Sequence, residues 1–190
     1  TFGNGSPTYS SYRLALWKYL KGAGIKFSFV GSQHSGAKEL EQRANEGHPG
    51  WHIRQISAHI VTWLQEYRPT YVLLHIGTND IWFHDDVLHA PERLRLLIEQ
   101  ITETLPGVTV LVAQITPEGA QYERQVASFN GAIPGIVSAE VAAGKRVEFA
   151  GESYTVQPIR PEAFAGVQIV LSSTPGKVSK EYSPIAAKAG

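Results

Sequence analysis

Residues 71–80, Tyr-Val-Leu-Leu-His-Ile-Gly-Thr-Asn-Asp, carry the strongest fold signal in this chain. The first part is a mostly apolar run of the kind found in strands that are buried on both faces of a parallel sheet. The run ends in a small polar turn from Gly77 to Asp80. In open α/β sheets ligands bind at the carboxyl ends of the strands. We therefore expect the chemistry of this protein at the turn.

Helices on either side follow from the spacing of apolar residues. Residues 53–64 carry an apolar side chain at every third or fourth position, and Pro69 ends the pattern. A second stripe begins after Pro91, which suits the first turn of a helix. Its members are Leu94, Leu97, Ile98, Ile101 and Leu105. We expect a third helix at residues 121–143, kinked or divided by Pro134.

The N-terminal part predicts one more helix and a long loop. Tyr12, Leu16 and Leu20 share a helical face, and Ser10 or Ser11 can cap that helix. Residues 31–50 are polar and lack periodicity. Loops of this length inside compact domains are often functional.

Strands alternate with these helices. Residues 25–30 mix aromatic and β-branched side chains, residues 108–115 form a second apolar run, and residues 147–149 form a short one. Strands separated by long helices indicate right-handed βαβ units and a parallel sheet covered on both faces. We expect a single α/β domain over residues 1–190, of which residues 151–190 fit the pattern poorly. In that tail, we expect residues 167–171 to be a strand and residues 179–189 a short helix.

Composition limits the partners. Seventeen Lys and Arg residues balance 17 Asp and Glu residues, and neither charge forms a long run. Binding to nucleic acid or to an anionic membrane is therefore disfavoured. The absence of Cys excludes disulfides and thiolate metal sites. No apolar stretch approaches the roughly 18 residues of a membrane span, and the N-terminus lacks signal-peptide features, so we expect a soluble, already trimmed chain. We also expect a monomer.

Three blocks of the sequence stand out together. They are Thr1-Phe2-Gly3 followed by Ser11-Tyr12-Arg13, Asn45-Glu46-Gly47-His48-Pro49-Gly50-Trp51, and Leu74-His75-Ile76-Gly77-Thr78-Asn79-Asp80. These blocks resemble the SGNH or GDSL-type hydrolases, and within them the carbohydrate esterases of family three, which look like acetyl xylan esterases. The resemblance covers roughly residues 1–149. It implies a secreted enzyme with a flavodoxin-like, three-layer α/β/α sandwich, in which a Ser attacks an ester carbonyl.

The same resemblance assigns the groups that stabilise the oxyanion. By the match to the second and third blocks, Gly50 and Asn79 are the oxyanion-hole residues, with Gly47 as the rival of Gly50. Elementary chemistry agrees, because a Gly lets the backbone approach a ligand closely and an Asn amide is a neutral donor. Asp80 is expected to be a structural hydrogen-bond acceptor.

The chain departs from the family pattern at both ends. The family's first block is Gly-Asp-Ser-Ile/Leu-Thr, and this chain begins at what resembles its final Thr, so the nucleophile is expected before Thr1. The family's Asp-x-x-His-Pro motif has no counterpart, because the last His is His89 and the last Asp is Asp86. Two explanations stay open: a truncated or altered form, which we favour, and a degenerate member that binds without hydrolysing. Residues 167–171 are also a candidate for the vacant strand position.

Aromatic residues suggest where a sugar would bind. Trp51, Trp82 and Phe83 flank the expected site on loops. Such rings stack on sugar faces, although simple loop anchoring explains them as well.

The remaining polar candidates have structural alternatives. His48 and His52 are four residues apart, but Pro49 and Gly50 between them disfavour a metal pair, and we expect neither metal nor cofactor. A second group consists of His84, Asp85 and Asp86. These residues could replace the family's catalytic His and Asp only if the side chains of adjacent residues converged on one point. In principle a third group offers replacement nucleophiles, although loop and cap roles explain it more simply: Ser6, Ser10 and Ser11.

We expect a serine esterase of the SGNH class that removes acetyl groups from a polysaccharide such as xylan, or acts on another small ester. The alternative is a non-catalytic carbohydrate-binding module on an esterase scaffold. A third hypothesis, a flavodoxin-like nucleotide or signalling domain, lacks a phosphate-binding loop in the sequence.

Overall fold

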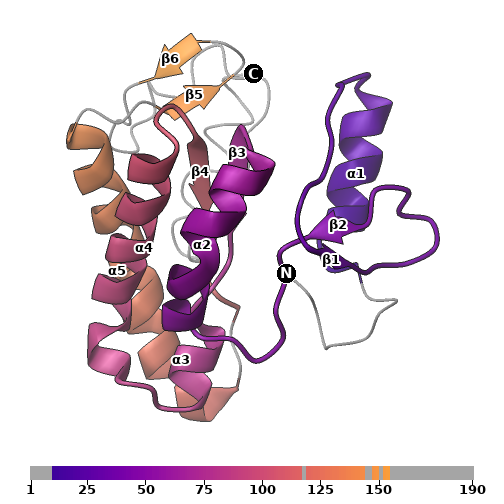
Figure 1. The fold of residues 1–190 in the computed structure, drawn as a ribbon. Helices are drawn as coiled ribbons and strands as arrows, with labels where there is room; N and C mark the ends of the chain where they lie inside the picture. Colours follow the sequence, from indigo (N-terminus) through magenta and orange to yellow (C-terminus); the bar gives the residue numbers. More distant parts are fainter. Residues whose placement is uncertain (1–9, 117–118, 144–146, 150–151, 155–190) are drawn as a thin grey trace, which may run out of the picture. The chain divides into compact units, whose positions relative to one another are not determined.

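The structure is a computed structural model that describes residues 10–116, 119–143, 147–149 and 152–154 (Figure 1). The chain divides into two compact units, Thr1–Ile136 and Val137–Gly190. The division into compact units does not test the expected single domain over residues 1–190, which stays a prediction. No helix in the described part of the chain combines the length and apolar character needed to cross a membrane.

The apolar run at the start of residues 71–80 forms strand β3 (Tyr71–Leu74), which pairs in parallel with β4 (Thr109–Val112). The parallel pairing that the sequence predicts is confirmed. Burial on both faces is wrong for β3, because Leu74 is buried while Tyr71 and Leu73 are 51% and 38% exposed. Alternate residues of a strand point to opposite faces, and only the Leu74 face of β3 meets the core.

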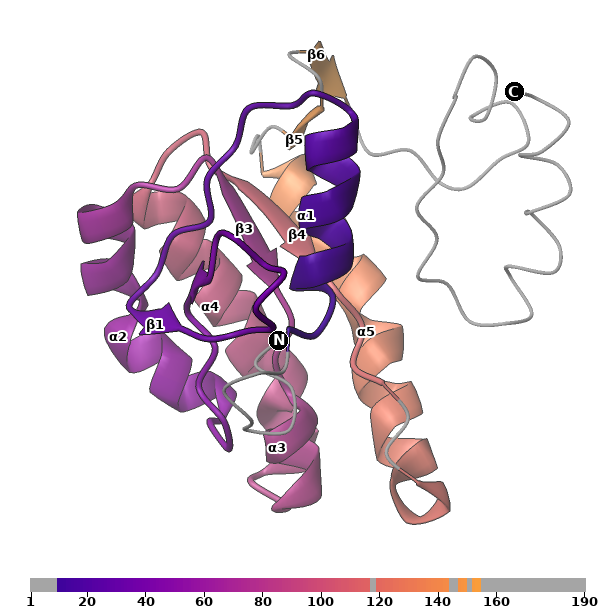
Figure 2. The same cartoon turned by 90° about the vertical axis from the view of Figure 1, so that its right-hand side faces the viewer.

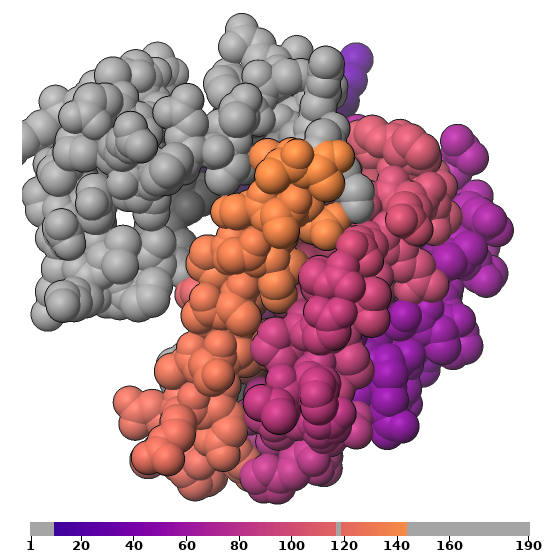
Figure 3. Space-filling model, turned by 90° about the vertical axis from the view of Figure 1, so that its left-hand side faces the viewer, coloured from indigo at the N-terminus to yellow at the C-terminus, as the bar shows by residue number. Residues whose placement is uncertain are grey.

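Helices α2 (Ile53–Tyr67) and α4 (Ala90–Thr104) confirm two of the predicted helices. They pack against each other on one side of β3 and β4, as Figure 2 shows. Figure 3 shows the outer surface that the two helices form side by side. Most of their buried residues belong to the predicted stripes: Ile53, Ile56, Ile60 and Leu64 in α2, and Leu94, Leu97, Ile98 and Ile101 in α4. Leu105 of the predicted α4 stripe is instead the half-buried C-cap residue, and Ala90 is buried at the start of α4.

The polar turn after β3 is the start of a short helix, α3 (Thr78–Trp82). Gly77 precedes it with φ +118°, a backbone conformation that side chains with a Cβ rarely adopt. The expectation of a simple turn is therefore wrong at Asn79 and Asp80, which lie on helical backbone. The chain continues through the 3-10 helix η1 (Val87–His89) into α4.

Helix α1 (Arg13–Gly22) confirms the N-terminal helix but not its predicted buried face. The buried residues are Arg13 and Trp17, whereas Tyr12 is 37% exposed. Arg13 is buried because its guanidinium donates to Ser35 O at 2.9 Å and to Ser35 Oγ at 3.2 Å. Side-chain hydrogen bonds outweigh apolar spacing here, and periodicity does not report them.

The long loop that follows contains the short antiparallel pair β1 (Gln33–His34) and β2 (Ala44–Asn45). The predicted strand at residues 25–30 is wrong, since the structure places irregular backbone there. The Gln42 amide takes the place of a neighbouring strand. It accepts from Phe29 N at 2.7 Å and donates to Phe27 O at 3.1 Å.

Helix α5 (Glu123–Ala142) follows the 3-10 helix η2 (Ala120–Tyr122) and contains Pro134 without being divided by it. Asn130 of α5 holds the end of the β4 segment, because its side chain accepts from Ile115 N and donates to Ile115 O, both at 2.9 Å.

The predicted short strand is confirmed as β5 (Val147–Phe149). It pairs antiparallel with β6 (Glu152–Tyr154), outside the parallel pair. The strand expected at residues 167–171 and the helix expected at residues 179–189 lie outside the described residues.

Candidate active site

Asn79 lies at the point where the second and third sequence blocks meet. Its Nδ2 donates to the main-chain oxygen of Trp51 at 2.8 Å. A carbonyl oxygen only accepts hydrogen bonds, so this contact fixes which end of the Asn79 amide faces Trp51. The amide nitrogen carries a second N–H, which stays available for another acceptor.

Gly50 lies on the other block, one residue before Trp51. It is exposed, has φ +78°, and has no atom within 4 Å of the place where a Cβ would stand. No described residue accepts a hydrogen bond from its N–H. The N–H of Gly47, in contrast, donates to Asn45 Oδ1 at 3.0 Å. Of the two glycines, only Gly50 has an N–H that no residue in the described part of the chain binds, which leaves it open to a ligand there.

Asp80 is fully buried and uses both carboxylate oxygens within the protein. Oδ2 accepts from Ile53 N at 3.0 Å, and Oδ1 accepts from Arg93 at 2.9 Å. The structural role expected for Asp80 agrees with these contacts.

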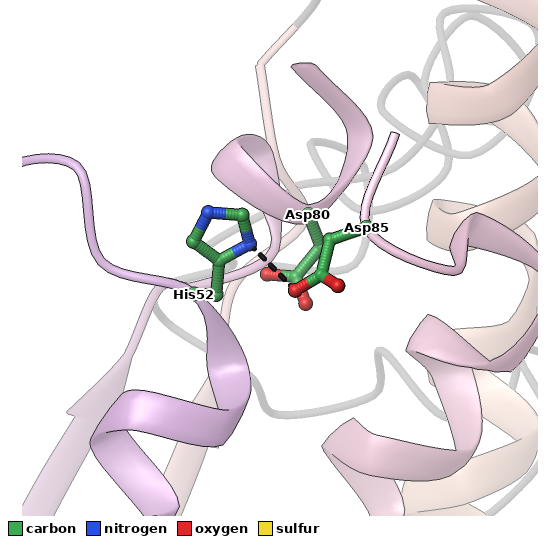
Figure 4. Close-up of side chains that lie close together, drawn as sticks. All are labelled: His52, Asp80 and Asp85. Atoms are coloured by element: carbon green, nitrogen blue, oxygen red, sulfur yellow. Dashed lines mark ion pairs between the residues drawn. The ribbon is translucent and has the colours of Figure 1, made fainter. Parts of the chain in front are cut away.

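A pair that the sequence did not predict joins the segments that directly follow these two blocks (Figure 4). His52 Nδ1 lies 2.9 Å from Asp85 Oδ2. The sequence grouped Asp85 with His84 and Asp86, and the structure separates them: Asp86 pairs with His89 at 2.8 Å. No local pattern connects His52 with Asp85, because they belong to different loops.

Ligand atoms of His52, Asp80 and Asp85 lie within 4.8 Å of one another, close enough to surround a cation. Both carboxylates already have cationic partners, since Arg93 lies 2.9 Å from Asp80 and Arg54 lies 3.0 Å from Asp85. The charges of the cluster are therefore compensated by the protein itself. His48 is not part of this cluster. His48 and His52, which were considered from the sequence as a possible metal pair, therefore have separate partners.

Trp51 belongs to a group of aromatic and imidazole rings. His48 stacks on Trp51 with 4.0 Å between ring centroids and on Trp63 with 5.0 Å. His59 lies 5.3 Å from Trp51, and His48 Nε2 pairs with Glu46 at 2.8 Å. His59 and Trp63 were not predicted from the sequence. The signal that could have identified them is their four-residue spacing, which places both on one face of α2.

Trp82 and Phe83 are 44% and 64% exposed on α3 and directly after it. Trp82 lies 6.4 Å from Tyr122, and Phe83 lies 5.6 Å from His52. The three aromatics expected to bind substrate therefore do not form one cluster.

The serines considered as replacement nucleophiles have other surroundings. Ser10 is buried and its Oγ accepts from Ala37 N at 2.7 Å. Ser11 is half-buried two residues before the start of α1, and Ser6 lies outside the described residues. Ser10 is thus a structural residue.

Comparison with known proteins gives matches of three kinds for most of the chain. Residues 20–150 match the GDSL-like lipase/acylhydrolase family. The solved structure of a family 3 carbohydrate esterase from Clostridium thermocellum has a TM-score of 0.70 and 39% identity, covering 77% of this chain and 70% of that one. An acetyl esterase mutant solved with acetate ion has a TM-score of 0.63 and 26% identity, covering 70% and 68%. The putative endoglucanase X of Acetivibrio thermocellus is 38% identical over 97 residues, which are 51% of this chain and 41% of that protein.

These matches confirm the predicted α/β sandwich fold and the predicted family resemblance. The chain spans about two fifths of the length of the curated relative, 41%.

The C-terminal part is similar to a different family. Residues 124–190 match the NAD-binding domain of semialdehyde dehydrogenases. Aspartate-semialdehyde dehydrogenase of Bacillus subtilis (strain 168) is 44% identical over 55 residues, which are 29% of this chain and 16% of that protein. The two family matches overlap at residues 124–150, and the boundary between the compact units, after Ile136, falls inside this overlap. Residues 124–190 contain neither Asp nor His, so the Asp-x-x-His-Pro motif does not occur in this segment.

Proposed function

Because the chain belongs to the GDSL-like lipase/acylhydrolase family, we propose that its first unit is the oxyanion-stabilising part of a serine esterase that deacetylates a polysaccharide such as xylan. The observation that carries the proposal is the geometry around Trp51. Its carbonyl orients the Asn79 amide at 2.8 Å, and its neighbour Gly50 presents a free N–H.

The chemistry needs two parts. A Ser Oγ forms a bond to the ester carbonyl carbon and gives its proton to a His base, and the carbonyl oxygen becomes an oxyanion. Gly50 and Asn79 donate hydrogen bonds to that oxygen. Each donor of this kind contributes about 10² to 10³ in rate. Collapse of the tetrahedral intermediate releases the alcohol, and the acyl-enzyme is then hydrolysed by water.

The substrate class follows from the relatives and from the exposed rings. The similar solved structures are carbohydrate and acetyl esterases by their names. Trp82 and Phe83 offer exposed aromatic faces on which a sugar ring can stack. A neutral chain suits a neutral acetylated carbohydrate or another small ester. We also propose that the protein acts outside the cell, as a monomer, without a cofactor.

The first experiment measures hydrolysis of 4-nitrophenyl acetate by this chain. We expect weak hydrolysis or none, because the sequence contains no Gly-Asp-Ser block and no Asp-x-x-His motif. Robust turnover that disappears when one of the chain's own Ser residues is replaced would contradict the assignment of roles.

The oxyanion donors themselves are tested with sodium acetate as the anion. In ¹H–¹⁵N spectra we expect acetate to shift the Gly50 backbone amide and the Asn79 side-chain amide. The Gly47 amide, which is already hydrogen-bonded, serves as the internal control. Equal shifts at Gly47, or none at Gly50 and Asn79, would argue against the proposed function.

A non-catalytic carbohydrate-binding module is the second candidate, and the exposed aromatics favour it. In that case the chain binds soluble xylan without releasing acetate, and Trp51→Ala or Trp82→Ala abolishes binding. Retained binding in both variants would count against this candidate.

A further inference from the structure

Three contacts join residues 51–53 to residues 79–85, and one of them is made by a fully buried carboxylate. We propose that Asp80 is a positioning residue that sets the separation of the two oxyanion donors, and that Arg93 holds it in place. This inference rests on the proposed function of Gly50 and Asn79.

Asp80 binds the chain just after the second block, at the residue where helix α2 begins. Its Oδ2 accepts from the N–H of Ile53, the first residue of α2. The first N–H groups of a helix have no partner within the helix, so an acceptor there stabilises the helix start. Here the acceptor comes from the third block. The start of α2 is thereby tied to α3 through a buried charge-assisted hydrogen bond.

Arg93 completes the arrangement from α4. One guanidinium nitrogen donates to Asp80 Oδ1 at 2.9 Å and to the main-chain oxygen of Asp85 at 2.6 Å. The other terminal guanidinium nitrogen donates to the main-chain oxygen of Asp86 at 3.1 Å. A fully buried carboxylate without a cationic partner is costly. Arg93 both compensates Asp80 and holds the loop after α3, which keeps the carboxylate in one orientation.

The two donors lie close to this contact along the chain. Asn79 directly precedes Asp80, and Gly50 lies three residues before Ile53. The hydrogen bond from Asn79 to Trp51 O runs alongside the one from Ile53 to Asp80. Two adjacent bridges of this kind restrict rotation as well as separation. Donors to an oxyanion must be held within about 0.5 Å of the productive geometry, so a loosened bridge weakens anion binding before it unfolds the protein.

The experiment compares acetate affinity in the full-length chain with its thermal stability. Acetate is titrated into ¹⁵N-labelled wild type, Asp80→Asn and Asp86→Asn, and the Gly50 and Asn79 amide shifts give the dissociation constant. Asp86 is the matched control, because it is 58% exposed and lies 3.7 Å from the same Arg93 without contacting α2. We expect Asp80→Asn to bind acetate about tenfold more weakly, and Asp86→Asn to stay within about twofold of wild type.

The outcomes separate the inference from the function on which it rests. If wild type shows no shift at Gly50 and Asn79, the oxyanion assignment fails and the inference fails with it. If wild type responds but Asp80→Asn binds acetate equally well, with only its melting temperature lowered, Asp80 is merely structural and the inference alone is overturned.

A second variant keeps the test decisive if Asp80→Asn does not fold. Arg93→Lys retains the positive charge, but a single ammonium lacks the planar fork that reaches Asp80 and two main-chain oxygens together. We expect acetate affinity to fall by about threefold. Unchanged affinity in a folded Arg93→Lys protein would contradict the positioning role.

Discussion

The ring of Phe129 occupies the space that a side chain on Gly77 would need. A Cβ built on Gly77 would lie 2.5 Å from Phe129 Cζ, and the glycine has φ +118°. Glycine is therefore required for two independent reasons at the point where β3 becomes α3. Because Phe129 belongs to α5, this contact also joins the start of the candidate site to a helix far along the chain.

Replacement of Gly77 is expected to be costly. Gly77→Ala adds both backbone strain and a clash with Phe129, and we expect a loss of about 2–4 kcal/mol of unfolding free energy. Urea denaturation followed by Trp fluorescence measures it, since all four Trp residues lie in the first compact unit. Gly131→Ala is the control, because that helical glycine has open space around it. A cost at Gly77 no larger than at Gly131 would refute the steric argument.

The side-chain N–H donor of Asn79 is expected to be required for stability. Both its removal and its replacement by an acceptor should destabilise the protein. Asn79→Ala leaves Trp51 O without its partner and costs about 1 kcal/mol. Asn79→Asp costs more at neutral pH, because a carboxylate then faces a carbonyl oxygen.

The penalty of Asn79→Asp depends on pH with a defined sign. The neighbouring acceptor raises the folded-state pKa of the new carboxyl above its unfolded value of about 3.9. The extra cost is thus complete above the folded-state pKa and disappears below the unfolded one. Urea unfolding of wild type and variant between neutral and acidic pH measures it, with Gln65→Glu on the exposed side of α2 as the control. A pH-independent difference would contradict the orientation of the Asn79 amide.

Arg13 is expected to be the residue of α1 that contributes most through hydrogen bonds. Burial lowers the pKa of its guanidinium, which still donates to two main-chain oxygens, Ser35 O at 2.9 Å and Arg43 O at 3.3 Å. Arg13→Ala strips these buried acceptors and should cost about 3 kcal/mol. Lys18→Ala, exposed on the same helix, should change stability by less than about 0.5 kcal/mol. Thermal unfolding measures both variants. Equal melting temperatures for Arg13→Ala and Lys18→Ala would contradict the role of the Arg13 hydrogen bonds.

Gln42 is expected to stabilise the segment at residues 25–30. Gln42→Ala removes the two hydrogen bonds to Phe27 and Phe29, at an expected cost of about 1–2 kcal/mol. Hydrogen exchange at the Phe29 amide should accelerate in this variant. Gln65→Ala is the control, since Gln65 is exposed on α2. Unaltered protection of Phe29 would show that another group accepts its N–H.

Elements with strong periodicity were predicted correctly. The apolar stripe of α2 and four of the five predicted members of the α4 stripe are buried, because burial of one helical face depends on spacing; Leu105 falls at the C-cap instead. The parallel pairing of β3 and β4 followed from the intervening helix. Two of the wrong predictions have one cause. Residues 25–30 and the buried face of α1 are governed by Gln42 and Arg13, whose hydrogen bonds reach residues far away in sequence.

Short motifs and the period of apolar residues were enough to predict the family, the α/β fold and the candidate donors. They could not show that Gly50 rather than Gly47 has a free N–H, or that Asp80 and Asp85 bind the start of α2, which emerged only from the folded chain. A hydrogen bond depends on which groups face each other in space. Spacing along the chain carries that information only within a helix or a strand.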